Sequence, residues 1–337
     1  MNRGRIETVW FESAVLRGNP LGDPHVRRIP VWLPPSYDRE PTKRHPVLFA
    51  LTGFGSRGRG LLNDNPWSPS LDDRLDALMA AGHPECIVVM PDAFTRLGGA
   101  QYMDSTATGA YETHLVEELL PWVDANLRTL AEPRHRALAG RSSGGFAALR
   151  LGMRHPDRFG ALASHSGDLL FEYAYAPDFP RACSVLQEAG GLTRFLEAWD
   201  RKPQKGKDDF LAFNIVGMAA CYSPDPTAEM GIALPFDLAT GLPRPEVFAR
   251  WLEHDPLRLL ATHADALRGM RLLYLDCGTR DEYHLHHGAR AFARELTRLG
   301  IAHLHEEFAD GHMNVGYRWD RSLPLLLQAI AAGPMAR

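Results

Sequence analysis

The sequence has few cysteines, no long apolar run and no large excess of charge of either sign. Its four cysteines, Cys86, Cys183, Cys221 and Cys277, lie far apart in the chain, so the disulfide framework of a small secreted domain is not expected. No apolar run approaches the ~20 residues that a membrane-spanning helix needs, and the charged N-terminus lacks the apolar segment of a secretory signal. These absences predict a cytoplasmic protein with reduced thiols and no membrane partner.

The charge balance argues against a highly charged partner. A formal net charge of −4 and a pI near 6.4 give no reason to expect nucleic acid or an anionic membrane as a partner. Hydrophobic residues at 45% and charged residues at 23% are ordinary for a globular protein, which disfavours disordered and fibrous classes. The composition therefore favours a small neutral or organic ligand, and it carries no information on the oligomeric state.

Apolar runs and helical patterns alternate along the 337 residues in the manner of a β-α-β fold. Residues 6–16 and 26–33 predict two antiparallel strands joined by a turn-rich connector. Further strands are predicted at 47–52, 86–91, 135–140, 159–164, 270–276 and 301–308, and helices at 71–81, 111–130, 290–299 and near the C-terminus. Short apolar strands of this kind are buried on both faces of a parallel sheet. We therefore expect a single α/β domain over residues 1–337, with a mostly parallel sheet between two layers of helices.

Residues 168–264 interrupt this alternation with many prolines and aromatic residues. So long a departure inside a compact domain is usually a functional insertion. It leaves the sheet directly after the strand at 159–164, and we expect it to form a helical cap over the site. Trp199, Phe213 and Trp251 are the aromatic residues that we expect to influence which substrates fit.

The segment Gly140-Arg141-Ser142-Ser143-Gly144 lies between an apolar strand and an Ala-rich helix. A strand, a Gly-x-Ser-x-Gly turn and a helix are together typical of a nucleophile elbow, in which the serine adopts a strained backbone conformation. The neighbours two residues away must lack bulk, and Gly140 and Gly144 meet this condition for Ser142. Centring the motif on Ser143 would instead force the side chain of Arg141 against the neighbouring strand. The pattern therefore predicts Ser142 as the nucleophile, although alone it would fit a helix N-cap equally well.

A nucleophilic serine needs a base, and the base needs a carboxylate that orients it. His312 follows the last predicted strand, and Asp281 follows the strand before it, so both are expected at the same edge of the sheet as Ser142. The chain order Ser, Asp, His is the order found in α/β-hydrolases. Glu282 is the nearest alternative to Asp281, and Asp276 is a second one.

Two backbone N–H groups are candidates for binding an oxyanion. The N–H of Ser143 lies at the start of the helix after the nucleophile, and the N–H of Phe54 lies in a glycine-bracketed turn after the strand at 47–52. Tyr102 is a candidate substrate contact, although packing of its own loop explains a tyrosine there as well. The histidines at 284–287 and 303–305 lack the spacing of a zinc site, and no phosphate-binding loop is present. The sequence predicts neither a metal nor a cofactor.

At these residues the chain resembles the esterase D-like family of α/β-hydrolases, which includes enterochelin esterases, feruloyl esterases, S-formylglutathione hydrolases and mycolyltransferases. The matching stretches are residues 31–37, 90–92, 98–99, 118–121, 140–145 and 310–312. Many members of the family have His-Gly where this chain has Thr52-Gly53, so the departure falls next to the expected oxyanion donor. The resemblance implies a three-layer α/β-hydrolase fold and covers most of the chain outside the insertion.

Together these residues predict a serine esterase that hydrolyses a small organic or aryl ester through an acyl-enzyme intermediate. An acyltransferase would use the same triad, and product analysis with an alcohol acceptor would distinguish the two. A catalytically silent binding protein on the same fold is the alternative from another class, and the presence of all three triad residue types argues against it. The identity of the acyl and alcohol groups is not encoded in these motifs.

Overall fold

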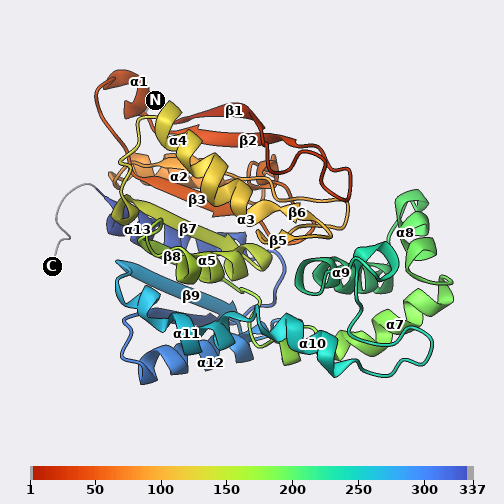
Figure 1. Ribbon diagram of the computed structural model, residues 1–337. Helices are drawn as coiled ribbons and strands as arrows, with labels where there is room; N and C mark the ends of the chain where they lie inside the picture. Colours follow the sequence, from red (N-terminus) through yellow and green to blue (C-terminus); the bar gives the residue numbers. More distant parts are fainter. Residues whose placement is uncertain (1–2, 332–337) are drawn as a thin grey trace.

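The computed structural model describes residues 3–331, and its centre is an eight-stranded sheet (Figure 1). The strands follow the order β1-β2-β4-β3-β7-β8-β9-β10. Their bounds are β1 (Arg5–Glu12), β2 (Val26–Leu33), β3 (Val47–Leu51), β4 (Ile87–Val89), β7 (Arg136–Arg141), β8 (Ala161–His165), β9 (Leu272–Gly278) and β10 (Leu304–Phe308). The pairs β1–β2 and β2–β4 are antiparallel, and all other pairs of this sheet are parallel. The predicted fold class, including the antiparallel start, is confirmed.

Helices cover both faces of the sheet because its central strands are apolar on both sides. Every residue of β3 is buried, and the alternating side chains of β3 divide between two cores. One core contains residues of α2 (Leu71–Ala80) and α13 (Trp319–Ile330). The other contains residues of α4 (Leu120–Asn126), α5 (Ser143–Arg154), α11 (Pro256–Arg268) and α12 (Leu285–Arg298). The result is the three-layer arrangement that the sequence predicts.

Shorter elements connect these layers. The helix predicted at 111–130 is a continuous run of α3 (Tyr111–Thr113), the π-helical η2 (His114–Leu119) and α4, and it ends at Asn126. The remaining short elements are α1 (Ser36–Arg39), η1 (Gly58–Leu61), η3 (Pro133–His135), η6 (Gly316–Arg318) and the hairpin of β5 (Asp104–Ser105) with β6 (Gly109–Ala110).

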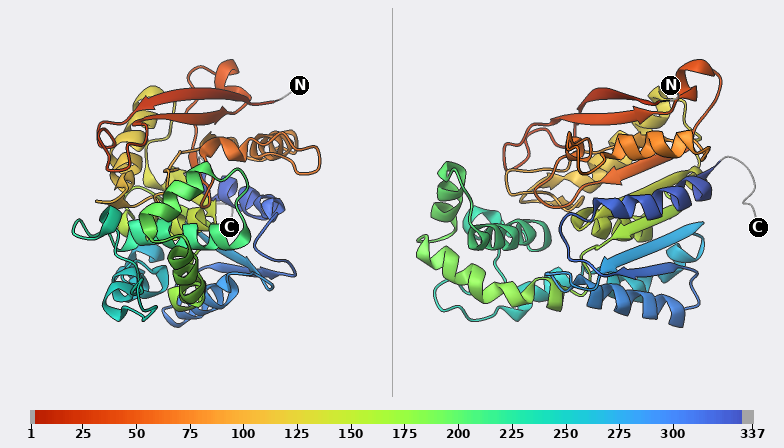
Figure 2. Two further views of the ribbon diagram at one scale, coloured as in Figure 1. Left: turned by 90° about the vertical axis from the view of Figure 1, so that its right-hand side faces the viewer. Right: turned by 180° about the vertical axis from the view of Figure 1, so that it is seen from behind.

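The insertion forms a helical lobe beside the sheet (Figures 1 and 2). The lobe contains α6 (Phe171–Ala174), η4 (Ala176–Asp178), α7 (Phe179–Glu188), α8 (Leu192–Arg201), α9 (Lys207–Tyr222), η5 (Glu229–Gly231) and α10 (Pro245–Leu252). The last helix of the segment, α11, instead packs against α5 in the layer below the sheet. The side chain of Asp255 caps α11 by accepting a hydrogen bond from the N–H of Leu257. The segment predicted as a cap over 168–264 therefore divides near Asp255 into a cap and a sheet-covering helix.

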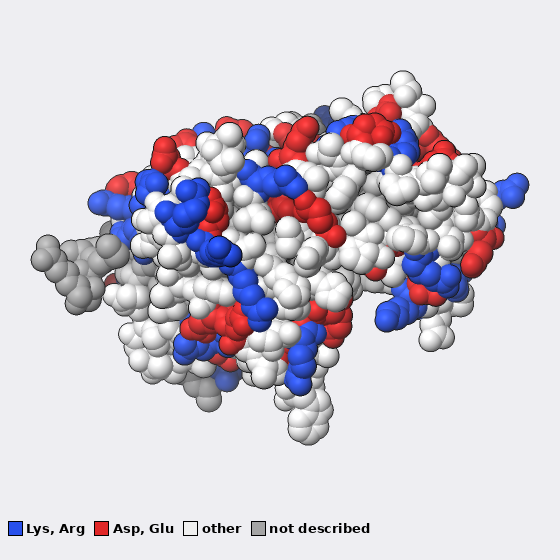
Figure 3. All heavy atoms as spheres, turned by 90° about the horizontal axis from the view of Figure 1, so that it is seen from below, with Lys and Arg blue, Asp and Glu red and all other residues white. Residues whose placement is uncertain are grey.

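The described residues include all four cysteines and a surface of mixed charge. All four cysteines are buried and free. In the part of the chain that the structure describes, no helix is long and apolar enough to cross a bilayer. Figure 3 shows acidic and basic side chains in neighbouring positions over the face seen from below, so charge of one sign does not gather into a single large patch on that face.

Candidate active site

The backbone between β7 and α5 turns sharply at Ser142. This residue has φ 57° and ψ −125°, a conformation that L-residues rarely adopt. Its N–H donates to the carbonyl of His165, at 2.9 Å. A Cβ on Gly140 would lie 2.6 Å from the backbone of Gly144, and a Cβ on Gly144 would lie 2.5 Å from the carbonyl oxygen of Leu51. The two glycines are therefore required by close packing, and the turn presents the hydroxyl of Ser142 at the edge of the sheet.

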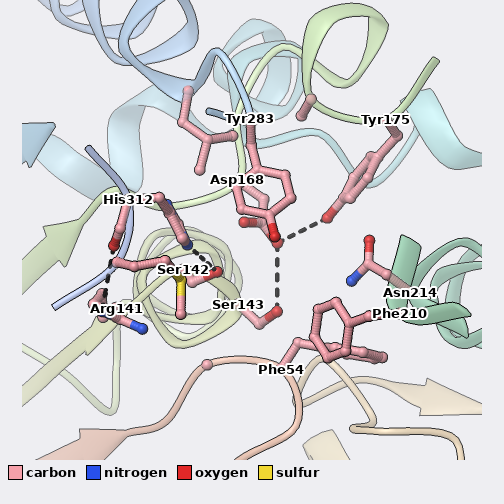
Figure 4. A pocket seen from close by; sticks show the side chains of 14 residues that line it. Phe54, Arg141, Ser142, Ser143, Asp168, Tyr175, Phe210, Asn214, Tyr283 and His312 are labelled. Carbon is pink, nitrogen blue, oxygen red and sulfur yellow. Dashed lines mark hydrogen bonds between the residues drawn. The ribbon is translucent and has the colours of Figure 1, made fainter. Parts of the chain in front are cut away.

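The structure brings Asp281 and His312 to Ser142, and Figure 4 shows the imidazole of His312 pointing toward the hydroxyl of Ser142. The Nε2 atom of His312 lies 3.1 Å from Oγ of Ser142. Its Nδ1 atom lies 2.8 Å from Oδ2 of Asp281. The other carboxylate oxygen of Asp281 accepts from the N–H of Tyr283, at 3.0 Å. Both side chains are buried, so a hydrogen-bonded chain of carboxylate, imidazole and hydroxyl reaches the surface of a pocket.

The two alternative carboxylates have other partners. Glu282 accepts from the backbone N–H of His312 at 2.7 Å, so it holds the histidine loop rather than the ring. Asp276 accepts from Nδ1 of His165 and from Nε of Arg318, both at 2.8 Å. Burial acts to raise the pKa of Asp276, but these two partners outweigh burial and lower it. Of the three candidates, only Asp281 contacts the imidazole of His312.

A second serine, histidine and aspartate chain lies between the sheet and α13. The Nε2 atom of His165 is 2.8 Å from Oγ of Ser322, and its Nδ1 atom bonds to Asp276. All three residues are at most 2% exposed. No substrate can reach them there, so this chain joins β8, β9 and α13 and has a structural role.

The two predicted oxyanion donors lie next to Ser142. Gly53 leads from β3 into the turn, and a Cβ there would lie 3.2 Å from Cβ of Ser142. Among residues 3–331, no backbone carbonyl accepts from the N–H of Phe54, and the N–H of Ser143 is at the free N-terminus of α5. Both donors are available to a ligand, as an oxyanion site requires.

The ring of Phe54 is held between the Gly98 loop and the cap. A Cβ on Gly98 would lie 2.2 Å from this ring, and one on Gly217 of α9 would lie 2.7 Å from it. The Phe54 ring also lies 6.0 Å from Phe210 and 5.9 Å from Phe213, centroid to centroid. The turn that carries a candidate oxyanion donor is therefore packed directly against the cap.

Tyr102 does not reach the pocket. It is 3% exposed, and its hydroxyl accepts from the N–H of Thr52 at 2.8 Å. Burial raises the pKa of Tyr102 to about 12. Tyr102 therefore fixes the end of β3 and does not line the pocket. This is the role in loop packing that the sequence left open as the alternative to a substrate contact.

The pocket above Ser142 has a volume of about 410 Å³, within the range of ligand sites. Its cap-derived walls are Ala174, Tyr175, Phe210 and Asn214. Trp199, Phe213 and Trp251, the three aromatic residues expected to influence which substrates fit, do not line it. Trp251 is fully buried and donates to Oγ of Ser223, while Trp199 stacks on Phe213 at 3.9 Å. Phe213 and Trp251 are part of the core of the cap and the half-buried Trp199 packs against it, so an influence of these three residues on substrate choice stays a prediction and would act through the shape of the cap.

Asp168 lines the pocket although no sequence motif singles it out. Its Oδ2 atom accepts from the hydroxyl of Tyr175 at 2.7 Å and from the amide of Gln101 at 3.4 Å. Burial raises the pKa of this carboxyl. Its position directly after β8 was the available signal, because ligands bind beyond the carboxyl ends of parallel strands.

Among the described residues, no group of three or more histidine, cysteine, aspartate or glutamate side chains is arranged to hold a metal ion. His286 and His287 lie side by side at the start of α12, where His287 is exposed and His286 is half-buried.

The profile of the family described as "Putative esterase" matches residues 24–324. The chain belongs to this esterase family. An esterase of Mycobacterium tuberculosis (strain H37Rv) is 30% identical to it over 236 residues, which are 67% of this chain and 48% of that protein. An endo-1,4-beta-xylanase/feruloyl esterase of Xylanibacter ruminicola is 29% identical over 175 residues, which are 50% of this chain and 22% of that protein. This family member thus spans less than half the length of these relatives.

Solved structures support the fold of this family member. A ferulic acid esterase covers 98% of this chain, and 100% of its own length is matched, with a TM-score of 0.65 and 20% identity. An S-formylglutathione hydrolase from Agrobacterium tumefaciens covers 98% of the chain, with 97% of its own length matched, a TM-score of 0.57 and 14% identity. At these identities the likeness is one of fold.

Proposed function

We propose that this chain is a serine carboxylic-ester hydrolase that acts through an acyl-enzyme intermediate. The observation that carries the proposal is the chain of contacts from Asp281 through His312 to Ser142, at 2.8 and 3.1 Å, at the base of a ligand-sized pocket. The family membership supports ester hydrolysis as the reaction class. A cytoplasmic location stays a prediction from the sequence.

In the first half-reaction, Oγ of Ser142 attacks the ester carbonyl carbon and its proton passes to Nε2 of His312. The negative charge that forms on the carbonyl oxygen is stabilised by the N–H groups of Phe54 and Ser143. Asp281 keeps the imidazole in the tautomer that has a free Nε2, and it stabilises the imidazolium. The imidazolium then protonates the alcohol oxygen as the C–O bond breaks, which leaves the acyl group on the serine.

In the second half-reaction, water takes the position of the alcohol. The neutral imidazole of His312 removes a proton from it, and the resulting tetrahedral intermediate uses the same two N–H donors. Collapse of the intermediate returns the proton to Oγ of Ser142 and releases the carboxylic acid.

The substrate class follows from the walls of the pocket. Phe54 and Phe210 provide aromatic surface, and Tyr283 lies beside the imidazole of His312 with ring centroids 4.8 Å apart. A pocket of this size and lining suits an aryl ester or another small organic ester. Feruloyl esterases among the relatives and structural neighbours, by their names, act on one such class, and a phenolic acyl group is a reasonable first substrate to test.

The test compares Ser142→Ala with Ser143→Ala on phenyl acetate. We expect Ser142→Ala to abolish the formation of phenol and of a covalent fluorophosphonate adduct, because the nucleophile is gone. Ser143→Ala keeps its backbone N–H and should keep most of the activity. Full turnover by a folded Ser142→Ala protein would overturn the proposal. An added alcohol that outcompetes water, so that the new ester is formed faster than acetate, would identify an acyltransferase.

A further inference from the structure

Arg141 differs from the fully buried arginines of this protein in having no acidic partner. Each fully buried arginine lies within 4.0 Å of a carboxylate oxygen. The pairs are Arg27–Asp92, Arg74–Asp320, Arg136–Asp124, Arg150–Glu112 and Arg318–Asp276. No carboxylate oxygen among residues 3–331 lies within 4.0 Å of the Arg141 guanidinium. In the same part of the chain, other half-buried arginines, namely Arg28, Arg128, Arg250 and Arg271, also lack a carboxylate within this distance. Arg141 differs from them because it lines the pocket above Ser142, where a ligand can supply the opposite charge.

The side chain of Arg141 opens onto ligand-accessible space. It lines the pocket above Ser142 and also a second hollow of about 210 Å³, and Gly53 and Phe54 are the other residues common to both. One of its N–H groups donates to the carbonyl of His312 at 3.3 Å. Because a guanidinium has five N–H donors, most of its donors remain available. Burial lowers the pKa of Arg141, yet an arginine side chain stays protonated in proteins.

The position of Arg141 selects one part of the substrate. Figure 4 shows it on the same side of Ser142 as His312, away from Tyr175, Phe210 and Asn214. In the proposed reaction, Nε2 of His312 must reach the oxygen of the leaving alcohol. The alcohol group therefore lies on the Arg141 side, and the acyl group lies under the cap.

We propose that Arg141 binds an anionic group, a carboxylate or a phosphate, on the alcohol portion of the ester. The alcohol extends from Ser142 past Arg141 toward the second hollow. There the other lining arginine, Arg74, is already neutralised by Asp320, so Arg141 supplies the free charge. This inference rests on the proposed esterase function and names the substrate class of the same site.

The experiment uses two esters that differ only in charge, 4-carboxyphenyl acetate and the isosteric 4-carbamoylphenyl acetate. In the wild type we expect kcat/KM to be higher for the anionic ester by about 10- to 100-fold, the effect of hydrogen bonds to a charged group. Arg141→Gln should remove this preference, and Arg141→Lys should restore part of it. Arg294→Gln is the matched control, because Arg294 is exposed on α12 and lines neither hollow.

A second pair, phenyl hemisuccinate and phenyl succinamate, carries the charge on the acyl side. A charge preference that depends on Arg141 only in this pair would overturn the assignment to the alcohol. An equal preference in wild type and Arg141→Gln would overturn the anion site and leave Arg141 as a support for the His312 loop.

Binding separates this inference from the proposed function. Dissociation constants of the first ester pair are measured on Ser142→Ala and on the Ser142→Ala, Arg141→Gln double variant. Tighter binding of the anionic ester by the single variant alone supports the inference even if turnover fails. Equal binding of both esters by both proteins overturns it, while Ser142-dependent turnover of the neutral ester would leave the esterase proposal standing.

Discussion

Substitution of Gly217 tests whether the cap positions the turn at Phe54, which carries a proposed oxyanion donor and is called the oxyanion turn below. A Cβ at this residue would lie 2.5 Å from the carbonyl oxygen of Leu97 and 2.7 Å from the ring of Phe54, whereas ordinary contacts begin at 3.4 Å. Restoring an ordinary contact requires a displacement of about 0.7 Å between α9 and the Phe54 ring. The ring and the candidate donor N–H belong to the same residue, so we expect Gly217→Ala to move that donor.

The expected loss follows from the cost of misplacing a catalytic group. A displacement near 1 Å costs on the order of 10²-fold, and complete removal of one oxyanion donor costs about 10²- to 10³-fold in kcat. We therefore expect Gly217→Ala to lower kcat by about 10- to 100-fold. The loss should appear even with phenyl acetate, whose acetyl group is too small to need the cap walls.

The assay is steady-state kinetics on phenyl acetate together with thermal unfolding. Alanine favours a helix over glycine by about 1 kcal/mol, which offsets part of the steric strain and helps the variant to fold. Gly269→Ala is the control, since a Cβ there meets nothing within 4 Å. An unchanged kcat in a folded Gly217→Ala protein would refute the coupling between cap and oxyanion turn.

Three further predictions concern the triad, the pocket and stability. Asp281→Asn should lower kcat by about 10⁴-fold. Glu282→Gln should lower kcat far less, because the amide oxygen of glutamine can still accept the N–H that Glu282 now binds. A larger loss of kcat in Glu282→Gln than in Asp281→Asn would make Glu282 the orienting residue. Phe210→Ala should reduce the kcat/KM ratio of a bulky aryl ester to an acetate by about 10-fold, and an unchanged ratio would place selectivity elsewhere. Burial lowers the pKa of His254 from the ordinary 6.5 to about 4, so the folded protein favours the neutral imidazole. As the pH falls from 6.5 toward 4, the unfolded chain binds a proton at this residue and the folded protein does not, which lowers the free energy of unfolding by up to about 3 kcal/mol. In urea titrations His254→Phe should therefore show a shallower loss of unfolding free energy over this range than wild type or His287→Phe, and equal slopes in all three would contradict this assignment.

The sequence alone determined the fold and the position of the elbow, because both depend on local patterns. Buried strands need continuous apolar residues, and amphipathic helices need a period of 3.6, so the order of elements could be read directly. The glycines around Ser142 have the same local character, since their required smallness follows from a turn between adjacent elements. His312 could be selected because it directly follows the last strand, at the edge where parallel strands end.

The tertiary structure decided the features that depend on residues distant in the chain. Asp276, Asp281 and Glu282 are neighbours in sequence, and only the packing of the two loops shows that Asp281 faces the imidazole while the others bind His165 and a backbone N–H. In the same way, an aromatic residue of the cap is apolar whether it lines the pocket or fills the core of the cap. Trp251 and the pocket residues Arg141 and Asp168 acquire their roles from what surrounds them in space, because burial and charge compensation are properties of the folded neighbourhood and are not encoded in the residue type.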